Sequence, residues 1–377
     1  MSSSGKINKK KILIITNHSY MLYRFRKELI QKLLEDSEVV ISTPFVGHET
    51  DLKELGANCI KTDVDRRSIN PFTDLKLLRT YKTILKQEKP DLVITYSIKP
   101  NIYAGYLCGK MKIPFCANVQ GLGTAFQKAL LSNLVTVMYR TAFRKVETVF
   151  FENQANAQAF VRRRILSAKK EVVLSGAGIN LEEYRYCQYP DNEKVHFLYL
   201  GRIMKEKGMD ELFGAVEQLR KDGCEFVLDL VGFFEDEYKK QVEQLQNEGV
   251  VRFYGFQENP KPYYAQTDCV VLPSYHEGMS NVLLEAAASG RAIITTDIPG
   301  CREAIDNGKS GMLCKVKSTE SLYKAMKRFT ELSREKRELL GKTGREKMER
   351  EFDKKKVVEE TVKAITKART KQERGMK

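Results

Sequence analysis

The sequence lacks several features that would place a protein in particular classes. It has no tryptophan and only four histidines, at positions 18, 48, 196 and 276, without the spacing of a metal site. Its eight cysteines form no C-x-x-C pair, and most lie in or beside apolar runs. We therefore predict no structural zinc, and reduced, mostly buried thiols in a cytosolic protein.

Long apolar runs are also missing, since none approaches the roughly 20 residues that span a bilayer. The start, MSSSGKINKKKILIIT, is basic and then apolar, as in a signal peptide. Only residues 12–15 are apolar, however, and no cleavage-type small residues follow. We interpret this segment as the first strand of a sheet, preceded by a solvated tail.

Positive charge is concentrated in the first half of the chain. Residues 1–190 hold 30 Lys and Arg against 17 Asp and Glu, which is +13 of the total of +15. Such a basic half suggests a nucleic acid, a membrane surface or a phosphorylated substrate as partner. No basic stripe interleaved with aromatics is present, so we expect no nucleic acid and favour a membrane face or a lipid diphosphate. A merely solvated basic surface is the alternative.

Short apolar runs alternate with amphipathic segments along the whole chain. The predicted strands are residues 12–15, 39–42, 92–95, 115–119, 146–151 and 172–174, and then 197–200, 226–231, 250–253, 269–272 and 292–295. This alternation predicts an α/β protein with parallel sheets covered on both faces. Because it restarts after Tyr189–Pro190, we expect two Rossmann-like domains. Beyond residue 318 the chain reads as charged helix with an apolar stripe.

The segment HEGMSNVLLEAAASGRAIITTDIPG, residues 276–300, has the most specific pattern. It follows the predicted strand that ends at Leu272, and a Gly-Met-Ser turn leads into a predicted helix over residues 281–289. Glu277 would lie at the strand's carboxyl end and Glu285 inside the helix. Free N–H groups and the positive end of the helix dipole would lie between them, which is an arrangement that binds a diphosphate.

A second motif, GRIMKEKG, occupies residues 201–208 after another predicted strand. It places Arg202 and Lys207 on a strand-end loop, just before a helix expected to begin near Met209. Two fixed cations there can neutralise a diphosphate and the charge that grows on it as a glycosyl bond breaks.

Residues 276–300 closely resemble the donor-binding motif of retaining nucleotide-sugar glycosyltransferases of family 4. The resemblance covers nearly the whole chain and is strongest over residues 201–312. It implies the GT-B fold, in which two Rossmann-like domains face a central cleft. The implied domains are an acceptor-binding domain over 1–185 and a nucleotide-sugar-binding domain over 186–350. Residues 351–377 would then form a helix that crosses back to the first domain, plus a tail.

The resemblance also implies roles for individual residues of the second domain. Arg202, Lys207 and Glu277 are expected to be catalytic, without any metal or other cofactor and with a uridine-linked donor. The residues expected to bind the nucleotide sugar are Gly201, Gly255, Phe256, Gly278, Met279, Ser280, Asn281 and Glu285. A turn-and-core role for Gly255 and Phe256 is the alternative.

Strand-end loops of the first domain resemble those of a subgroup that extends polyprenyl-diphosphate-linked sugars for capsule, O-antigen or glycoprotein glycans. The segments are NHSYMLYRFR, RRSINP, YSIKPNIYAG and NVQGLGTAF. The residues expected on the acceptor side are His18, Arg26, Arg67, Lys99, Asn118, Gln120, Gly121 and Gly123. The first loop lacks the glycines usual in relatives, and Gln120 stands where many have a histidine, so we expect no general base there.

Three further patterns are open to more than one interpretation. Residues 128–145 form an amphipathic helix that could dock on a membrane, although core packing of its apolar face is the favoured alternative. Arg162, Arg163 and Arg164 make a compact cationic cluster. Asp63 and Asp65 imitate a metal-binding Asp-x-Asp, but we expect no metal there.

The sequence therefore predicts a retaining glycosyltransferase that moves a sugar from a nucleotide donor to a lipid-linked or glycan acceptor. We expect it to be cytoplasmic and peripheral on the inner membrane face, with an anionic membrane surface as partner. One alternative is a nucleotide-sugar epimerase of the same fold. Another is a catalytically silent binding subunit, against which the intact Glu277, Glu285, Arg202 and Lys207 argue.

Overall fold

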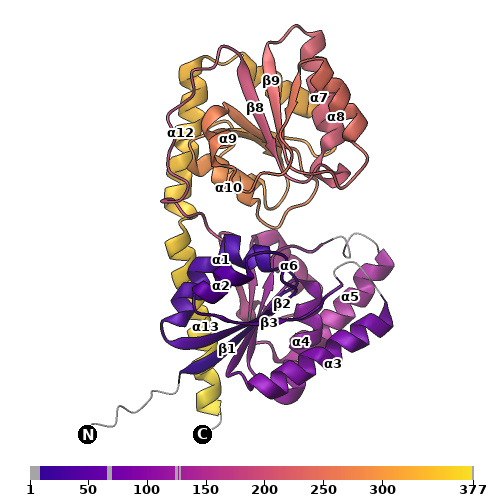
Figure 1. Ribbon diagram of the computed structural model, residues 1–377, viewed down its shortest axis with the longest axis vertical. Helices are drawn as coiled ribbons and strands as arrows, with labels where there is room; N and C mark the ends of the chain where they lie inside the picture. Colours follow the sequence, from indigo (N-terminus) through magenta and orange to yellow (C-terminus); the bar gives the residue numbers. More distant parts are fainter. Residues whose placement is uncertain (1–8, 66–69, 124–125, 127–128, 376–377) are drawn as a thin grey trace, which may run out of the picture. The chain divides into compact units, whose positions relative to one another are not determined.

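The computed structural model describes residues 9–65, 70–123, 126 and 129–375. It divides into two compact units (Figure 1). The first consists of Met1–Ala177 and Lys355–Lys377, and the second of Gly178–Lys354. The boundary predicted at residue 185 lies too late, because the Ile179 N–H donates to the Phe352 carbonyl at 2.7 Å, inside the second unit.

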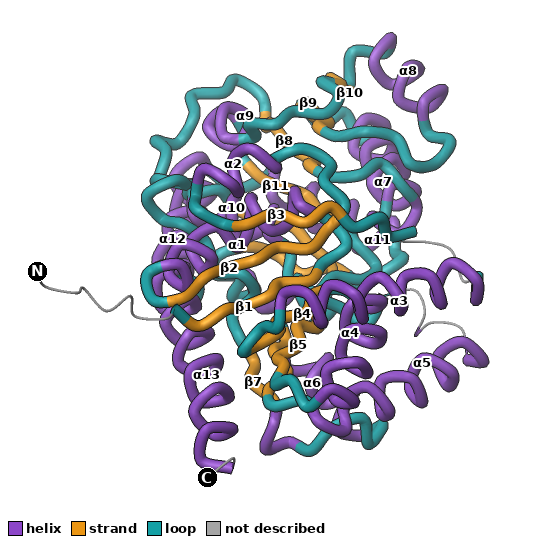
Figure 2. Tube along the Cα trace, turned by 60° about the horizontal axis from the view of Figure 1, so that its bottom comes forward, coloured by secondary structure: helices purple, strands orange, loops and turns teal. Residues whose placement is uncertain are grey.

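The first unit contains a seven-stranded parallel sheet with the order β3-β2-β1-β4-β5-β6-β7 (Figure 2). Its strands are β1 Lys10–Ile15, β2 Ser37–Thr43, β3 Asn58–Lys61, β4 Leu92–Tyr96, β5 Phe115–Val119, β6 Thr148–Phe151 and β7 Glu171–Val173. The helices between them are α1 Ser19–Leu34, α2 Glu49–Glu54, α3 Pro71–Glu88, α4 Ile98–Met111, α5 Ala129–Ala142 and α6 Gln154–Arg162.

Helices cover both faces of this sheet, as the alternating burial of β1 shows. Leu13 and Ile15 pack in one cluster with side chains of α3, α4, α5 and α6. Ile12 and Ile14 pack on the other face with α1 and α2. Successive strand residues point to opposite faces, so apolar residues at every position of a strand imply a sheet buried on both sides.

The C-terminal helix α13, Lys354–Gly375, joins the first unit. Its Val357, Ile365 and Ala368 are buried in the same cluster as Ile12 and Ile14. The last helix therefore packs on the sheet of the first unit.

The second unit contains a six-stranded parallel sheet with the order β10-β9-β8-β11-β12-β13. Its strands are β8 Val195–Leu200, β9 Phe226–Val231, β10 Val251–Phe253, β11 Cys269–Leu272, β12 Ala292–Thr296 and β13 Gly311–Cys314. Its helices are α7 Met209–Lys221, α8 Lys239–Asn247, α9 Lys261–Gln266, α10 Asn281–Ala288, α11 Thr319–Thr330 and α12 Arg334–Glu351.

Two strands, β3 and β13, were not predicted. Both are outermost in their sheets and only four residues long. Both ends of β3 are exposed, with only Cys59 and Ile60 half-buried between them. No continuous apolar run marks β3, and β13 is mostly buried but only four residues long, so both strands give a weak sequence signal.

In helix α5, the apolar face predicted for residues 128–145 is partly buried and partly exposed. Val135 is buried, and Leu131 and Met138 pack against the core of the first unit. Leu134 and Val137, by contrast, are 54% and 56% exposed. Core packing thus accounts for only part of the apolar surface of this helix.

The expectations about cysteines and membrane spans can be compared with the described residues. All eight cysteines lie in this part of the chain and none forms a disulfide. Burial raises the pKa of the Cys116 and Cys314 thiols to about 12. Among the described helices, none is long and apolar enough to cross a bilayer.

Candidate active site

The two motifs of the second unit follow adjacent strands. β8 pairs with β11 in parallel, with Phe197 opposite Cys269, and the chain order of the strands reverses at this pair, since β9 lies on the other side of β8. Ligands of open parallel sheets bind at the carboxyl ends of strands at such a switch point. Residues 201–208 leave β8 there, and residues 273–280 leave β11 beside them.

Lys207 and Glu277 form the central contact of this site. The Lys207 ammonium donates to Glu277 Oε1 at 2.5 Å, and the side chains are only 17% and 14% exposed. The Ser274 hydroxyl donates to the same oxygen at 2.8 Å. The pair joins residues seventy positions apart, so a cation and a carboxylate that were predicted separately meet at one point.

Arg202 lies on the same loop but has a different partner. Its guanidinium pairs with Glu235 at 2.8 Å and is 46% exposed. Its backbone carbonyl accepts a 2.5 Å hydrogen bond from the Tyr199 hydroxyl. Burial raises the pKa of Tyr199 well above its ordinary value, and the Glu277 charge adds to this, so the hydroxyl stays protonated and holds the loop.

Glycines let these loops approach each other closely. Gly208 has φ +76°, and a Cβ there would lie 2.1 Å from the Pro273 carbonyl oxygen. Gly300 has φ +87°, and a Cβ there would lie 2.4 Å from the Gly278 oxygen. The Ser280 N–H donates to the Gly300 carbonyl at 2.9 Å. Only glycine fits these positions, because they combine a left-handed backbone with no room for a side chain.

The turn after Glu277 leads directly into α10. Met279 and Ser280 are 6% and 4% exposed, and Ser280 is the N-cap residue. Its hydroxyl does not cap the helix, so the first N–H groups of α10, beginning at Asn281, stay available to an anion. The positive end of the helix dipole favours the same kind of ligand.

Glu285 lies inside α10 and is only 6% exposed. Its Oε2 accepts a 2.8 Å hydrogen bond from the Tyr264 hydroxyl. The Tyr264 carbonyl in turn accepts from Nε of Arg291, whose side chain is fully buried. The second carboxylate of the motif is therefore held by a tyrosine that the sequence did not single out.

The loops after β9 and β10 complete this end of the sheet. Gly232 donates its N–H to the Gly255 carbonyl at 2.9 Å. Phe256 is 57% exposed, and its ring lies 6.2 Å from that of Phe233, which is 44% exposed. Two exposed aromatic rings thus lie together on the strand-end side that also carries Gly201 and Arg202.

In the first unit, three of the residues predicted for the acceptor side are tied into side-chain contacts. Arg26 is 5% exposed and pairs with Glu152 at 2.7 Å. Lys99 pairs with Asp74 at 2.7 Å. The amide of Asn118, at the end of β5, donates to the Thr95 carbonyl at 3.3 Å.

Four other predicted residues of the first unit lie in loops. His18 is the residue before α1, with its ring 6.1 Å from that of Tyr20. Gln120 and Gly121 are half-buried, and Gly123 has φ +69° with Ile98 packed against its open side. Arg67 lies outside the described residues.

Several polar residues around these sites escaped sequence reasoning. In the second unit they are Ser274, Tyr264 and Glu235, which contact Glu277, Glu285 and Arg202. In the first unit, Ser97 has φ +74° at the end of β4 and its hydroxyl donates to Asn17 at 2.7 Å. Arg291 had a visible signal, a single charge before the apolar run AIITT. The others look like ordinary surface residues in the sequence.

Comparisons with known proteins agree with this arrangement. The family model "Glycosyl transferases group 1" matches residues 182–347, and "Glycosyl transferase 4-like" matches residues 11–153. The N,N'-diacetylbacillosaminyl-diphospho-undecaprenol alpha-1,3-N-acetylgalactosaminyltransferase of Campylobacter jejuni is 30% identical, over 80% of this chain and 84% of its own length. The capsular polysaccharide biosynthesis glycosyltransferase CapM of Staphylococcus aureus is 24% identical, over 92% of this chain and 94% of its own.

Solved structures show the same fold. A glycosyltransferase from Rickettsia africae superposes with a TM-score of 0.76 and 17% identity, over 96% of this chain and 99% of its own. Anabaena HepE in complex with UDP and glucose gives a TM-score of 0.78 and 16% identity, over 95% and 100% of the two chains. The predicted α/β class with two Rossmann-like domains of the GT-B type is confirmed. By family and by fold, this chain belongs to the group 1 glycosyltransferases and is a transferase.

Proposed function

We propose that the protein transfers a sugar from a uridine-linked nucleotide donor to a polyprenyl-diphosphate-linked sugar, with retained configuration and without a metal. The observation that carries the proposal is the Lys207–Glu277 contact beside the N-terminus of α10. It joins a cation suited to a diphosphate with a carboxylate suited to sugar hydroxyls. An anion-binding helix end begins a few residues farther along the chain.

The proposed chemistry rests on differential stabilisation of charge. Negative charge grows on the departing diphosphate as the glycosyl bond breaks, so Lys207 and Arg202 would stabilise the transition state more than the bound donor. Glu277 would hold the sugar through its hydroxyls, and Glu285 the ribose. The departing oxygen would accept the acceptor's proton on the same face, so retention requires no titratable side chain at Gln120.

The acceptor class is proposed from the relatives and from the surface of the first unit. Two Campylobacter jejuni relatives are named as transferases acting on diphospho-undecaprenol-linked sugars. Helices α3 and α5 pack on one side of the sheet (Figures 1 and 2). They carry exposed apolar side chains, with Phe72 84% exposed on α3 and Leu134 and Val137 exposed on α5. Apolar side chains next to a basic surface suit attachment to the membrane that holds such an acceptor.

A transfer assay with an undecaprenyl-diphosphate-linked sugar and a panel of nucleotide sugars tests this proposal. We expect the lipid product to gain one sugar, NMR to show the donor's anomeric configuration in the new linkage, and activity to persist with excess chelator. An inverted linkage would contradict the retaining mechanism, and loss of activity that magnesium restores would contradict metal independence. Release of free sugar and nucleotide without acceptor would favour the epimerase.

A further inference from the structure

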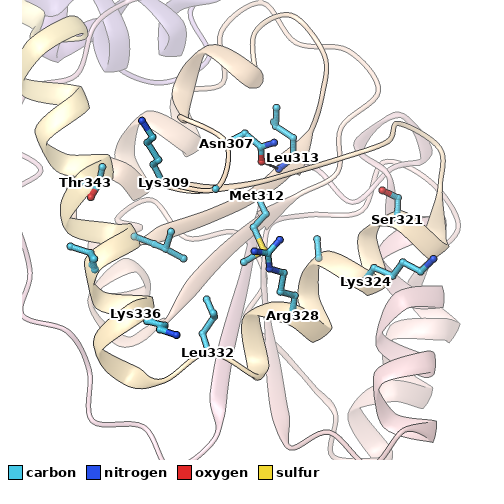
Figure 3. A pocket seen from close by; sticks show the side chains of 14 residues that line it. Asn307, Lys309, Met312, Leu313, Ser321, Lys324, Arg328, Leu332, Lys336 and Thr343 are labelled. Atoms are coloured by element: carbon cyan, nitrogen blue, oxygen red, sulfur yellow. Dashed lines mark hydrogen bonds between the residues drawn. The ribbon is translucent and has the colours of Figure 1, made fainter.

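The second unit has a cavity away from the candidate active site. It measures about 720 Å³ and lies beside the edge strand β13, between that strand and helices α11 and α12 (Figure 3). Asn307, Gly308 and Lys309 line it just before β13 begins, at the amino ends of the strands. The active-site loops follow β8 and β11 at their carboxyl ends, so these loops and residues 307–309 are at opposite ends of one parallel sheet.

The floor of the cavity is apolar. It is formed by Met312, Leu313, Ala325, Leu332, Leu339 and Leu340. Leu339 is 60% exposed although it belongs to this apolar group. An alkyl group bound there would remove its own apolar surface and that of the cavity floor from water, which is favourable.

Cations surround this floor and no lining residue is acidic. The basic residues are Lys309, Lys324, Arg328 and Lys336 (Figure 3). Lys324 is held by Glu320 at 2.6 Å. Within the described ranges the other three have no ion pair, and Asp306, three residues before Lys309 in the chain, is already engaged by Lys347 at 2.8 Å. Arg328 and Lys336, neither of which has an ion pair within the described ranges, thus line one cavity, whereas the Lys309 side chain points away from them (Figure 3).

We propose that this cavity binds a phosphate-headed amphiphile of a lipid surface, with its alkyl part on the leucine floor and its phosphate near Arg328 and Lys336. The cations favour an anionic head group, and the apolar floor favours an alkyl chain on the ligand. An acidic peptide fits less well, because the backbone N–H and C=O groups that it placed on the apolar floor would find no hydrogen-bonding partner there. Strand addition at β13 is opposed by Asn307, whose side chain already accepts the Leu313 N–H at 3.0 Å.

Calorimetric titration of the full-length protein with monomeric dodecyl phosphate tests the ligand chemistry. We expect saturable binding that weakens by about tenfold or more when Arg328→Gln and Lys336→Gln are combined. Leu339→Gln should also weaken binding, and because Leu339 is 60% exposed, this substitution leaves the buried core intact. The matched control combines Lys221→Gln with Lys342→Gln, two exposed lysines of the second unit outside the cavity, and should bind like the wild type.

Three comparisons can overturn the proposal. Equal affinity for inorganic phosphate would mean a plain anion site, and equal affinity for dodecyl maltoside would mean an apolar site only. Unchanged binding in the Arg328 and Lys336 double variant would place the ligand elsewhere. With phosphatidic acid vesicles, the same double variant should lower the bound fraction below that of the lysine control. Equal vesicle binding by the double variant and the lysine control would show that the cavity does not take its ligand from a lipid surface.

Discussion

At the residue scale, Lys207 has both a structural and a chemical role. It forms an ion pair with Glu277 in which both side chains are less than one-fifth exposed. Removing one partner of a buried pair leaves the other charge uncompensated, at a cost of about 3–5 kcal/mol. A loss of activity in a Lys207 variant therefore has to be separated from a loss of stability.

We predict that Lys207→Ala and Arg202→Ala each lower turnover by about 10²–10³ and weaken donor binding less, because leaving-group charge grows in the transition state. Lys205→Ala is the control, since Lys205 is 68% exposed and pairs only loosely with Asp210 at 3.4 Å. Steady-state kinetics at a temperature where all variants are folded, checked by circular dichroism, measures the effect. Wild-type turnover in either variant would remove that residue from the diphosphate site.

The two carboxylates of the motif should contact different parts of the donor, Glu285 the nucleotide and Glu277 the sugar. We predict that Glu285→Gln mainly weakens binding of the nucleotide diphosphate, while Glu277→Gln spares that binding and impairs sugar transfer. Tyr264→Phe should also weaken nucleotide binding, because it removes the 2.8 Å hydrogen bond that orients Glu285. Calorimetry with UDP and kinetics with the sugar donor separate the two effects. Equal losses of UDP affinity in both Glu variants would contradict the division.

At the element scale, close backbone contact fixes α12 against the loop after α10. A Cβ on Gly341 of α12 would lie 2.0 Å from the Gly290 carbonyl oxygen. Gly290 itself has φ +77° and follows the end of α10. The packing of these two helices thus depends on a glycine inside a helix.

We predict that Gly341→Ala destabilises the protein by about 1–3 kcal/mol through overpacking, although alanine favours a helix by roughly 0.5–1 kcal/mol. Gly109→Ala on α4 is the control. Its Cβ would make ordinary contact with the Lys145 side chain at 3.5 Å, so stability should stay equal or rise. Thermal unfolding of both variants decides this, and an unchanged melting temperature for Gly341→Ala would show that α12 can shift.

At the scale of the whole molecule, the net charge of +15 is concentrated in the first half of the sequence. The cluster at residues 162–164 is only partly available to a membrane. Arg163 donates to the Ser132 hydroxyl at 2.8 Å and lies over the Phe126 ring at 5.2 Å, so it holds α5 against α6. Arg162 and Arg164 are exposed.

We predict that the protein sediments with anionic vesicles and not with neutral ones, and that added salt releases it. Each cation near such a surface contributes roughly 1 kcal/mol, and screening acts within a Debye length of about 8 Å at physiological ionic strength. Replacing Arg162 and Arg164 by Ser should weaken attachment without the loss of packing that replacing Arg163 would bring.

Binding that resists salt but is lost when Leu134 and Val137 are replaced by Ser would indicate insertion of α5. No binding to either kind of vesicle would leave the basic half as solvated surface and would shift the acceptor towards a soluble molecule.

The sequence by itself determined the alternation of strands and helices and therefore the two parallel sheets. β5, β9 and β11 begin and end where their apolar runs do. It also determined which loops leave the strands at their carboxyl ends, because strand, turn and helix follow one another directly in both motifs. These features are local, so periodicity and turn residues are sufficient to predict them.

Only the tertiary structure decided which distant residues meet. The contact of Lys207 with Glu277 depends on the pairing of β8 with β11, and that of Glu285 with Tyr264 on the packing of α10 against α9. No local sequence pattern indicated the edge strand β13 with its cavity. The same holds for the packing of Arg163 between α5 and α6. Such contacts depend on strand order and side-chain packing, which bring together segments far apart in the chain, and no pattern within one segment encodes its partner.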